Sequence, residues 1–259
     1  MSGNGEVRLV RDGAVATIVF ARPEARNAMT WPMYEQLQQA CRELRDDRSC
    51  RVVVLRGEGG EAFVAGTDIA QFSGFTGGDD GLAYEARMEE VFADLESLPQ
   101  PTIAVVEGFA AGSGLLMSAI CDLRIATPRA RFGMPVARTL GNCLSMQNYA
   151  RLVSVLGASR VASVVMTASF IDAADALDAG FVTAVHDPEE LDAAVEALTE
   201  RIIQHAPLTM WATKEALRRL RASSLPDGDD LVHRVFGSQD FKEGVAAFTA
   251  KRPARWEWR

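Results

Sequence analysis

The sequence predicts an α/β body, residues 1–188, followed by a helical C-terminal region, residues 189–259. Two observations indicate the body: apolar runs rich in β-branched residues, such as residues 51–57 and 102–108, are typical of buried strands, and helical stretches alternate with them. A third observation indicates the C-terminal region, because only helical patterns follow Glu189. With 259 residues, of which 48% are hydrophobic, the chain can bury a sizeable core.

The body begins with a predicted hairpin. Residues 6–13 and 14–20 alternate like two strands, and Asp12-Gly13 favours a tight turn between them. After a loop, residues 21–30, Thr30 can cap a helix. The apolar face of that helix is formed by Tyr34, Leu37, Cys41 and Leu44.

The middle of the chain contains small, polar residues that predict a mobile surface loop at residues 73–81. A helix is expected to follow from about Tyr84 to Leu98, where Pro99 and Pro101 end it.

The second half of the body contains two further predicted strands, residues 122–127 and 181–187. Between them we expect a helix that Gly157 ends, and a short helix capped by Asp172 that ends at Gly180. In the C-terminal region, breaks are expected at Pro207 and at residues 223–230.

The composition excludes several classes of protein. The net charge is −8 and no basic run is present, which argues against nucleic-acid binding. No apolar stretch reaches the length of about 18 residues typical of a membrane span. Four cysteines without a C-x-x-C pair predict reduced thiols in a cytoplasmic protein, and three histidines far apart make a zinc site improbable.

Two glycine-rich stretches carry the chemistry that the sequence suggests: "FVAGTDI", residues 63–69, and "GFAAGSG", residues 108–114. Each follows a predicted buried strand and opens a helix, whose first N–H groups can hold an anion. Two such starts facing one pocket could donate to one developing oxyanion. Alternatively, the small residues merely allow helix and strand to pack closely.

Together with four further stretches in the same order, these loops resemble the crotonase (enoyl-CoA hydratase/isomerase) superfamily. The further stretches are "ARPEARNAM", "RFGMP", "FIDAADALDAGFVTAV" and "DFKEGVAAFTAKRP". The resemblance implies a spiral of ββα turns with a C-terminal helical oligomerisation region that builds a homotrimer or a hexamer. It also implies an acyl-CoA thioester substrate, with no tightly bound cofactor and no metal.

The resemblance also assigns roles to residues. The oxyanion hole would be formed by the backbone N–H groups of Thr67 and Ser113. The CoA part of the thioester would contact a second group: Arg26, Ala65, Gly66, Asp68, Ile69, Phe248 and Lys251.

The sequence departs from the family where the catalytic acids stand. The two glutamates of family hydratases are replaced by Leu116 and Val136, and the aspartate of some isomerases by Ser145. No Asp or Glu occurs between Asp122 and Asp172. The predicted acyl pocket therefore contains no acid and comprises Leu116, Val136, Asn142, Cys143 and Ser145.

We therefore expect an acyl-CoA enzyme that stabilises a thioester enolate without the two carboxylates used in standard hydration. Decarboxylation of a malonyl-type thioester and non-catalytic binding of a CoA thioester are alternatives. Isomerisation or hydration could use Glu85, Glu89 or Glu90, although each is also typical of a solvated helix charge. A Cys143 nucleophile and a Ser113 hydrolase are weaker hypotheses, because no histidine lies near either in sequence.

Overall fold

The structure is a computed structural model that describes residues 5–223 and 225–257. Its larger sheet has six strands in the order β1-β2-β3-β5-β7-β10. The pairing of β1 with β2 is antiparallel and the other pairings are parallel. The strand bounds are β1 Glu6–Asp12, β2 Val15–Ala21, β3 Val52–Gly57, β5 Thr102–Val106, β7 Leu123–Ala126 and β10 Ala184–Val185. The predicted hairpin is confirmed, whereas the strand expected at residues 181–187 is only two residues long.

A second sheet of four strands has the order β4-β6-β8-β9. Its strands are β4 Ala62–Val64, β6 Phe109–Ala111, β8 Arg131–Gly133 and β9 Phe170–Asp172. The successive pairs β3-β4, β5-β6 and β7-β8 each contribute one strand to each sheet, and a helical segment follows each pair. This repeat is the spiral of ββα turns that the resemblance implied.

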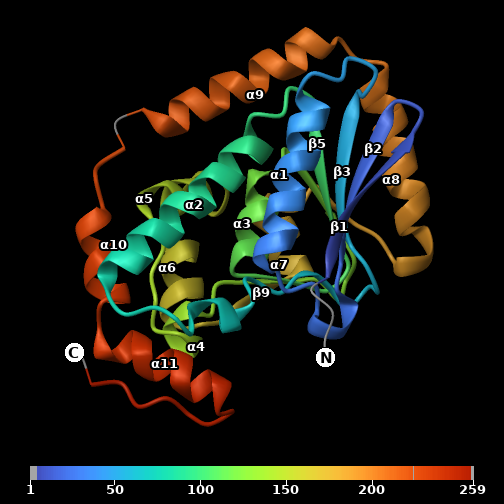
Figure 1. Cartoon of the computed structure of the whole chain (residues 1–259). Coiled ribbons are helices and arrows are strands. Elements are labelled where there is room, and N and C mark those ends of the chain that lie inside the picture. The colour runs from blue at the N-terminus through green and yellow to red at the C-terminus, as the bar shows by residue number, and fades with distance from the viewer. Residues whose placement is uncertain (1–4, 224, 258–259) are drawn as a thin grey trace.

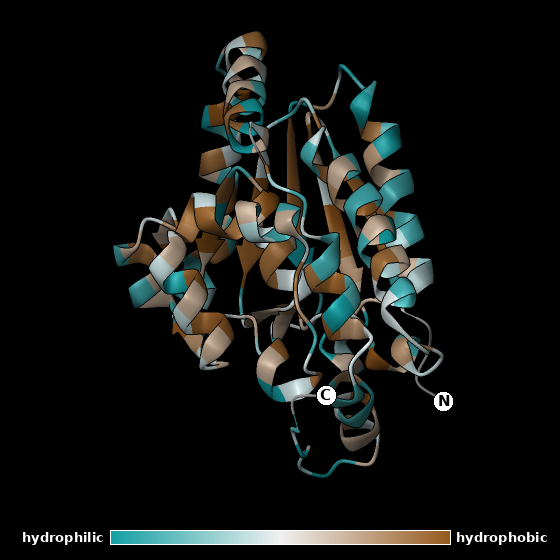
Figure 2. Cartoon of the chain, turned by 90° about the vertical axis from the view of Figure 1, so that its left-hand side faces the viewer, coloured by the Kyte–Doolittle hydropathy of each residue, from teal (hydrophilic) through white to brown (hydrophobic). Residues whose placement is uncertain are grey.

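The larger sheet is covered on both faces. Helix α1 (Trp31–Arg45) buries its predicted apolar face, and α8 (Pro188–Ile203) covers the opposite side of the sheet (Figure 1). On β3, Val53 and Leu55 join the main core, whereas Val52 and Val54 pack in a second core with residues of α8. Figure 2 shows the hydrophobic strands in the centre of the molecule and more hydrophilic surface on the outer helices. The prediction of a strand buried on both faces is confirmed.

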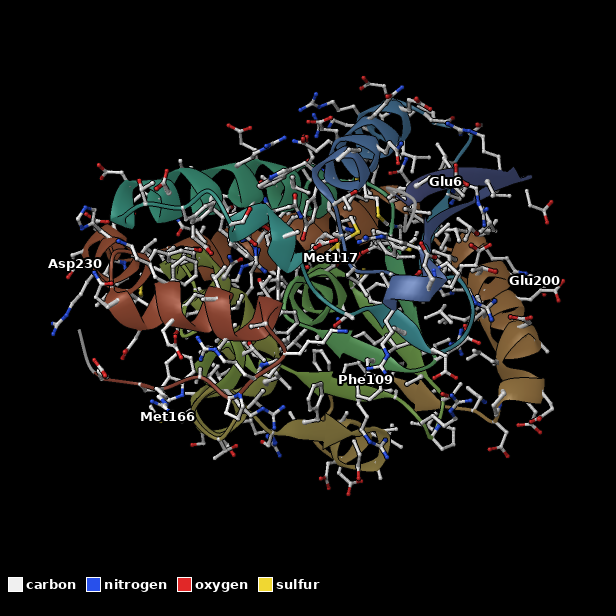
Figure 3. The ribbon with its side chains drawn as sticks, turned by 60° about the horizontal axis from the view of Figure 1, so that its bottom comes forward. Glu6, Phe109, Met117, Met166, Glu200 and Asp230 are labelled. Atoms are coloured by element: carbon white, nitrogen blue, oxygen red, sulfur yellow. The ribbon has the colours of Figure 1, made fainter. Side chains whose placement is uncertain are left out.

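Helix α3 (Ser113–Ile120) runs through the interior, and each of its residues is buried. In Figure 3, Met117 of this helix lies in the middle of the molecule, while Glu6 and Glu200 lie at its periphery. The N-terminus of α3 therefore opens inside the protein, where water competes little for its N–H groups.

Helix α2 (Gly78–Glu96) begins six residues before the predicted start, so part of the expected surface loop is helical. The Asp80 carboxylate accepts hydrogen bonds from the N–H groups of Thr76 and Gly77, which caps the helix. A Cβ on Gly81 would lie 2.3 Å from the Cβ of Phe236. The glycines that predicted a loop thus allow α10 to pack against α2.

The remaining helices follow the predicted breaks. The last strand of the body is followed by α8, then by α9 (Pro207–Ala222), α10 (Asp229–Phe236) and α11 (Gln239–Thr249). Earlier in the chain lie two short 3-10 turns, η1 and η2, and four more helices: η1 Pro23–Ala25, η2 Ile69–Phe72, α4 Val136–Thr139, α5 Met146–Leu156, α6 Ala158–Met166 and α7 Ala173–Asp178. Among the described residues no single helix is long and apolar enough to cross a membrane. Helices α5 and α6 together have the length and apolar composition of a span, but the pair is bent by 117°.

Candidate active site

The two glycine-rich loops lie side by side. Gly66 has a φ of +110° and Gly112 a φ of +54°, a conformation that residues with side chains rarely adopt. A Cβ on Gly112 would lie 3.5 Å from the Cα of Gly66, and one on Gly114 only 2.0 Å from the carbonyl oxygen of Val64. The explanation by close packing therefore holds for Gly114, whereas Gly66 and Gly112 adopt backbone angles that favour glycine.

Two backbone N–H groups of these loops reach the same cavity. Ser113 is the first residue of α3, whereas Thr67 precedes only the short turn η2, so the predicted helix start holds for the second loop alone. Met29 pairs with both neighbours of Thr67: its N–H donates to the Gly66 carbonyl and its carbonyl accepts from Asp68, each at 2.8 Å. Within residues 5–223 and 225–257, the N–H groups of Thr67 and Ser113 have no protein acceptor. Both are available to a ligand oxygen.

A chain of four hydroxyl groups connects the two loops behind these N–H groups. The Tyr34 hydroxyl donates to Ser113 Oγ at 2.9 Å and lies 2.7 Å from Thr67 Oγ1, which lies 2.9 Å from the Tyr84 hydroxyl. Burial raises the pKa of Tyr34 to about 12, so its phenol stays neutral. The side chains of Thr67 and Ser113 are thus occupied by protein partners, and their loops are fixed to α1 and α2.

The cavity has a volume of about 180 Å³ and is lined mainly by apolar side chains. Leu116 and Val136, where the resemblance led us to look for glutamates, line it and are 4% and 9% exposed. Asn142 also lines it, and the Asn142 Oδ1 atom has no hydrogen-bond partner in the described part of the chain. Cys143 and Ser145 do not line the cavity, so the structure brings together only three of the five predicted acyl-pocket residues.

The lining contains one acidic residue among those that the structure describes, Glu85 of α2. Its side chain is buried, and Glu85 Oε2 accepts hydrogen bonds of 3.1 Å from the Ser145 N–H and from Asn148 Nδ2. Burial raises the pKa of Glu85 to about 7, although these hydrogen bonds act against the rise. Glu89 instead pairs with Arg151, and Glu90 is exposed. Of the three acids considered from the sequence, only Glu85 reaches the cavity.

Arg151 of α5 fixes the orientation of the amide beside Glu85. It is 3% exposed and forms ion pairs with Glu89, at 2.5 Å, and with Glu96, at 3.2 Å. Its Nη1 atom also donates to Asn148 Oδ1 at 3.0 Å. Because the oxygen of Asn148 faces Arg151, its NH₂ group faces Glu85.

The residues predicted to contact CoA divide into two groups. Ala65, Gly66, Ile69 and Phe248 line the cavity, and Phe248 is 49% exposed. Three do not line it: Asp68, Arg26 and Lys251.

The three residues outside the lining have other surroundings. The Asp68 carboxylate accepts from the Ala70 N–H and forms an ion pair of 2.7 Å with the buried Arg22. Arg26 is exposed and lies over the Phe109 ring, 5.4 Å from its centroid. Lys251 is exposed beyond the end of α11, where its N–H donates to the carbonyl of Phe248.

The weaker nucleophile hypotheses gain no support. Burial raises the pKa of the Cys143 thiol to about 12, which leaves it protonated and a poor nucleophile. The Ser113 hydroxyl accepts from Tyr34, a neutral phenol that cannot act as its base. In the residues that the structure describes, no cluster of His, Cys, Asp and Glu could hold a metal ion.

Sequence reasoning missed Tyr34 as a site residue, together with Tyr84 and Arg151. Tyr34 was predicted to be buried, but nothing in the local pattern indicates that its hydroxyl reaches two loops. Helical spacing carries a signal for Glu85, because Met88 and Phe92 on the same face of α2 also line the cavity.

Comparison with known proteins establishes the family. Residues 11–259 match the family model of enoyl-CoA hydratase/isomerase. The chain is 31% identical over 250 residues to the short-chain-enoyl-CoA hydratase of Clostridium acetobutylicum, covering 95% of each protein. It is also 31% identical to the crotonyl-CoA hydratase of Syntrophomonas wolfei, covering 96% of each. The chain belongs to the enoyl-CoA hydratase/isomerase family and is an enoyl-CoA hydratase-like enzyme of the crotonase type.

Solved structures confirm the fold. A methylmalonyl-CoA decarboxylase in complex with 2-nitronate-propionyl-CoA is similar, with a TM-score of 0.88 and 30% identity, covering 97% of this chain and 98% of that one. An enoyl-CoA hydratase/carnithine racemase from Magnetospirillum magneticum has a TM-score of 0.80 and 31% identity, covering 98% and 96%. The predicted crotonase-like α/β fold with C-terminal helices is confirmed.

Proposed function

We propose that this enzyme binds an acyl-CoA thioester and stabilises its enolate through the N–H groups of Thr67 and Ser113. The observation that carries the proposal is that Thr67 and Ser113, on adjoining loops, line one cavity and that their N–H groups have no acceptor among the described residues. An enolate places its negative charge on the thioester oxygen, and two N–H donors in a dry site stabilise that charge strongly. CoA enters as part of the substrate, and the chemistry needs no metal.

The lining argues against standard hydration as the reaction. Syn addition of water needs two carboxyl groups that position the water and transfer its proton. Leu116 and Val136, which occupy both positions, have no group that can hold or move a proton. The proposed chemistry therefore passes through the enolate with a single proton-transfer group.

Decarboxylation of a malonyl-type thioester is a second candidate. Loss of CO₂ leaves the bonding electrons on the α-carbon, so the enolate forms without a base to remove a proton. Two structures of methylmalonyl-CoA decarboxylase with bound CoA compounds have TM-scores of 0.88 at 30% identity, and the family acid positions of this chain are apolar. Both observations support this candidate.

Turnover of a panel of thioesters tests these proposals: crotonyl-CoA, a 3-enoyl-CoA, a dienoyl-CoA and methylmalonyl-CoA. Conversion of the 3-enoyl or the methylmalonyl compound, with slow hydration of crotonyl-CoA, is the expected result. Fast hydration of crotonyl-CoA would contradict the proposed role of the apolar lining. Tight binding without any product would instead favour a non-catalytic CoA-thioester-binding protein.

We further propose that the chain forms a homotrimer or hexamer in the cytoplasm. Helix α9 buries none of its residues and exposes four large apolar side chains: Leu208, Trp211, Leu217 and Leu220. Such a surface favours contact with another copy of the chain. Unpaired cysteines support a reducing compartment. Light scattering that gives a mass near the 28.1 kDa of one chain would contradict the trimer.

A further inference from the structure

Glu85 is a buried carboxyl group that forms no ion pair with any residue that the structure describes. It lies on the same face of α2 as Met88 and Phe92, which also line the cavity, and it is 8% exposed. Its hydrogen-bond donors are the N–H and the hydroxyl of Ser145 and the amide of Asn148, all of them neutral. The nearby Arg151 is engaged by Glu89 and Glu96. Burial of a carboxylate without a counter-charge is costly, so such a group is typically kept for proton transfer rather than for stability.

We infer that Glu85 is the catalytic acid–base group of this site, acting on the carbon atoms next to the thioester. The inference rests on the proposed function, because it needs a thioester whose oxygen is held by Thr67 and Ser113. It assigns the proton transfer to α2, on a different wall from the two family acid positions in α3 and α4.

The proton and electron balance closes with this single group. For isomerisation of a 3-enoyl thioester, the Glu85 carboxylate takes a proton from C2 and the C–H electrons form the enolate. The same carboxyl returns the proton to C4, the double bond moves to C2–C3, and the thioester carbonyl re-forms. For decarboxylation, CO₂ leaves, the neutral carboxyl protonates C2, and the resulting Glu85 carboxylate takes up one proton from bulk solvent, so that each turnover consumes one proton.

A second opening gives Glu85 a route to solvent. Besides the acyl cavity, Glu85 lines a second depression formed by α2, the start of α5 and α10, whose lining includes the exposed Glu90, Gln147 and Asp229. Glu85 therefore borders both the acyl cavity and this depression. A proton can be exchanged with water while the thioester fills the cavity, as decarboxylation requires.

The groups that face Glu85 leave it as the titrating group of the cavity. Five titratable or charged neighbours on other elements act on it or lie next to it: Tyr34 from α1, Cys143 before α5, Tyr149 and Arg151 on α5, and Asp229 of α10, which lines the same depression. On α2 itself Tyr84 precedes it, and Glu89 one turn away raises its pKa further. Burial raises the pKa of each tyrosine and of the thiol above its ordinary value, so these groups stay neutral near pH 7.

Asn148 is a positioning residue for this carboxyl group. Arg151 holds its oxygen, so its NH₂ group donates to Glu85 Oε2 and favours the charged form. Replacement of Asn148 by Ala removes that donor, and the pKa of Glu85 should rise. A purely structural role for Asn148 would not move the pH profile.

Glu85→Gln tests the inference with a side chain of the same shape. Two readouts apply: turnover of the substrate found with the thioester panel, and exchange of the C2 protons of butyryl-CoA in D₂O. We expect kcat to fall by about 10²–10⁴-fold with little change in KM. The wild-type pH profile should show an inflection near 7, set by the carboxyl, that E85Q lacks and N148A shifts upward. Glu43→Gln, an exposed glutamate of α1 that lines neither the acyl cavity nor the second depression, is the matched control and should behave as wild type.

The outcomes separate the inference from the function on which it rests. An E85Q variant with wild-type kcat and an unchanged pH profile overturns the inference and leaves the proposed function standing. A variant that loses thioester binding, measured by calorimetry, rather than kcat also overturns it. A wild-type protein that binds the thioesters but neither converts nor exchanges them overturns the proposed function itself.

Discussion

The two sides of the acyl cavity hold their functional groups in different ways. On one side, the loops around Gly66 and Gly112 present backbone N–H groups, and their glycine conformations and four linked hydroxyls hold them in place. On the other side, a single side chain of α2, Glu85, is held by the start of α5. Backbone donors depend on the course of the chain, whereas a carboxyl can be supplied by any element that borders the cavity. The oxyanion side can therefore stay fixed while the proton-transfer group changes its position.

The largest expected effect comes from deleting a backbone donor. Ser113→Pro removes the N–H at the first position of α3, where helices tolerate proline. The loss of one oxyanion donor should raise the barrier by about 2.7–4 kcal/mol, or roughly 10²–10³-fold in kcat. Steady-state kinetics on the substrate identified with the panel measure it.

Thr67→Ala is the matched control, because it keeps the N–H of the same oxyanion hole. It should retain most activity and lose about 1–3 kcal/mol of stability, since Tyr34 and Tyr84 each lose a hydrogen-bond partner. A Thr67→Ala variant as inactive as Ser113→Pro, yet folded, would show that the hydroxyl takes part in the chemistry.

The carboxyl side can be tested through stability. The pKa of Glu85 in the folded protein, about 7, lies above its ordinary value of 4.5, so the native state binds this proton more tightly than the unfolded chain does. Its favourable contribution is complete below about pH 4.5 and is lost as the pH rises through 7, a change of up to about 3 kcal/mol. Glu85→Gln removes this pH dependence. The free energy of unfolding of the variant should therefore exceed that of wild type by more at pH 8 than at pH 5. Urea unfolding at both pH values measures it, and an equal difference at the two would contradict the buried, neutral carboxyl.

The same contrast explains what the sequence could predict. Glycine spacing predicted two loops with unusual backbone because Gly66, Gly112 and Gly114 are required by local backbone angles or by contact with a neighbouring strand. The start of α2 was predicted too late, because Gly78 and Gly81 permit packing against α10, a partner about 150 residues away in the chain.

The burial of Glu85 likewise depends on tertiary packing. A carboxyl on a helix is usually solvated, and only the rotation of α2 about its axis turns this one inward together with Met88. Helical spacing could have indicated that face, but the cavity it borders is formed by loops far away in the sequence. The hydroxyl chain through Tyr34 was unpredictable for the same reason.

The smallest expected effect concerns CoA binding at the mouth of the cavity, on the oxyanion side. Phe248 lines the cavity, and Lys251 follows it at the exposed end of α11. We predict that its ammonium binds the 3′-phosphate of CoA. An exposed ion pair of this kind contributes about 0.2–1 kcal/mol, so Lys251→Ala should weaken CoA binding by only about two- to fivefold. Dephospho-CoA, which lacks that phosphate, should bind both forms equally, and Lys242→Ala, an exposed lysine earlier on α11, should change neither affinity. Calorimetry with both ligands measures the two losses of affinity. An equal loss for CoA and dephospho-CoA in Lys251→Ala would show that Lys251 contacts another part of the nucleotide. Lys251 would then act on the oxyanion side only through the position of Phe248.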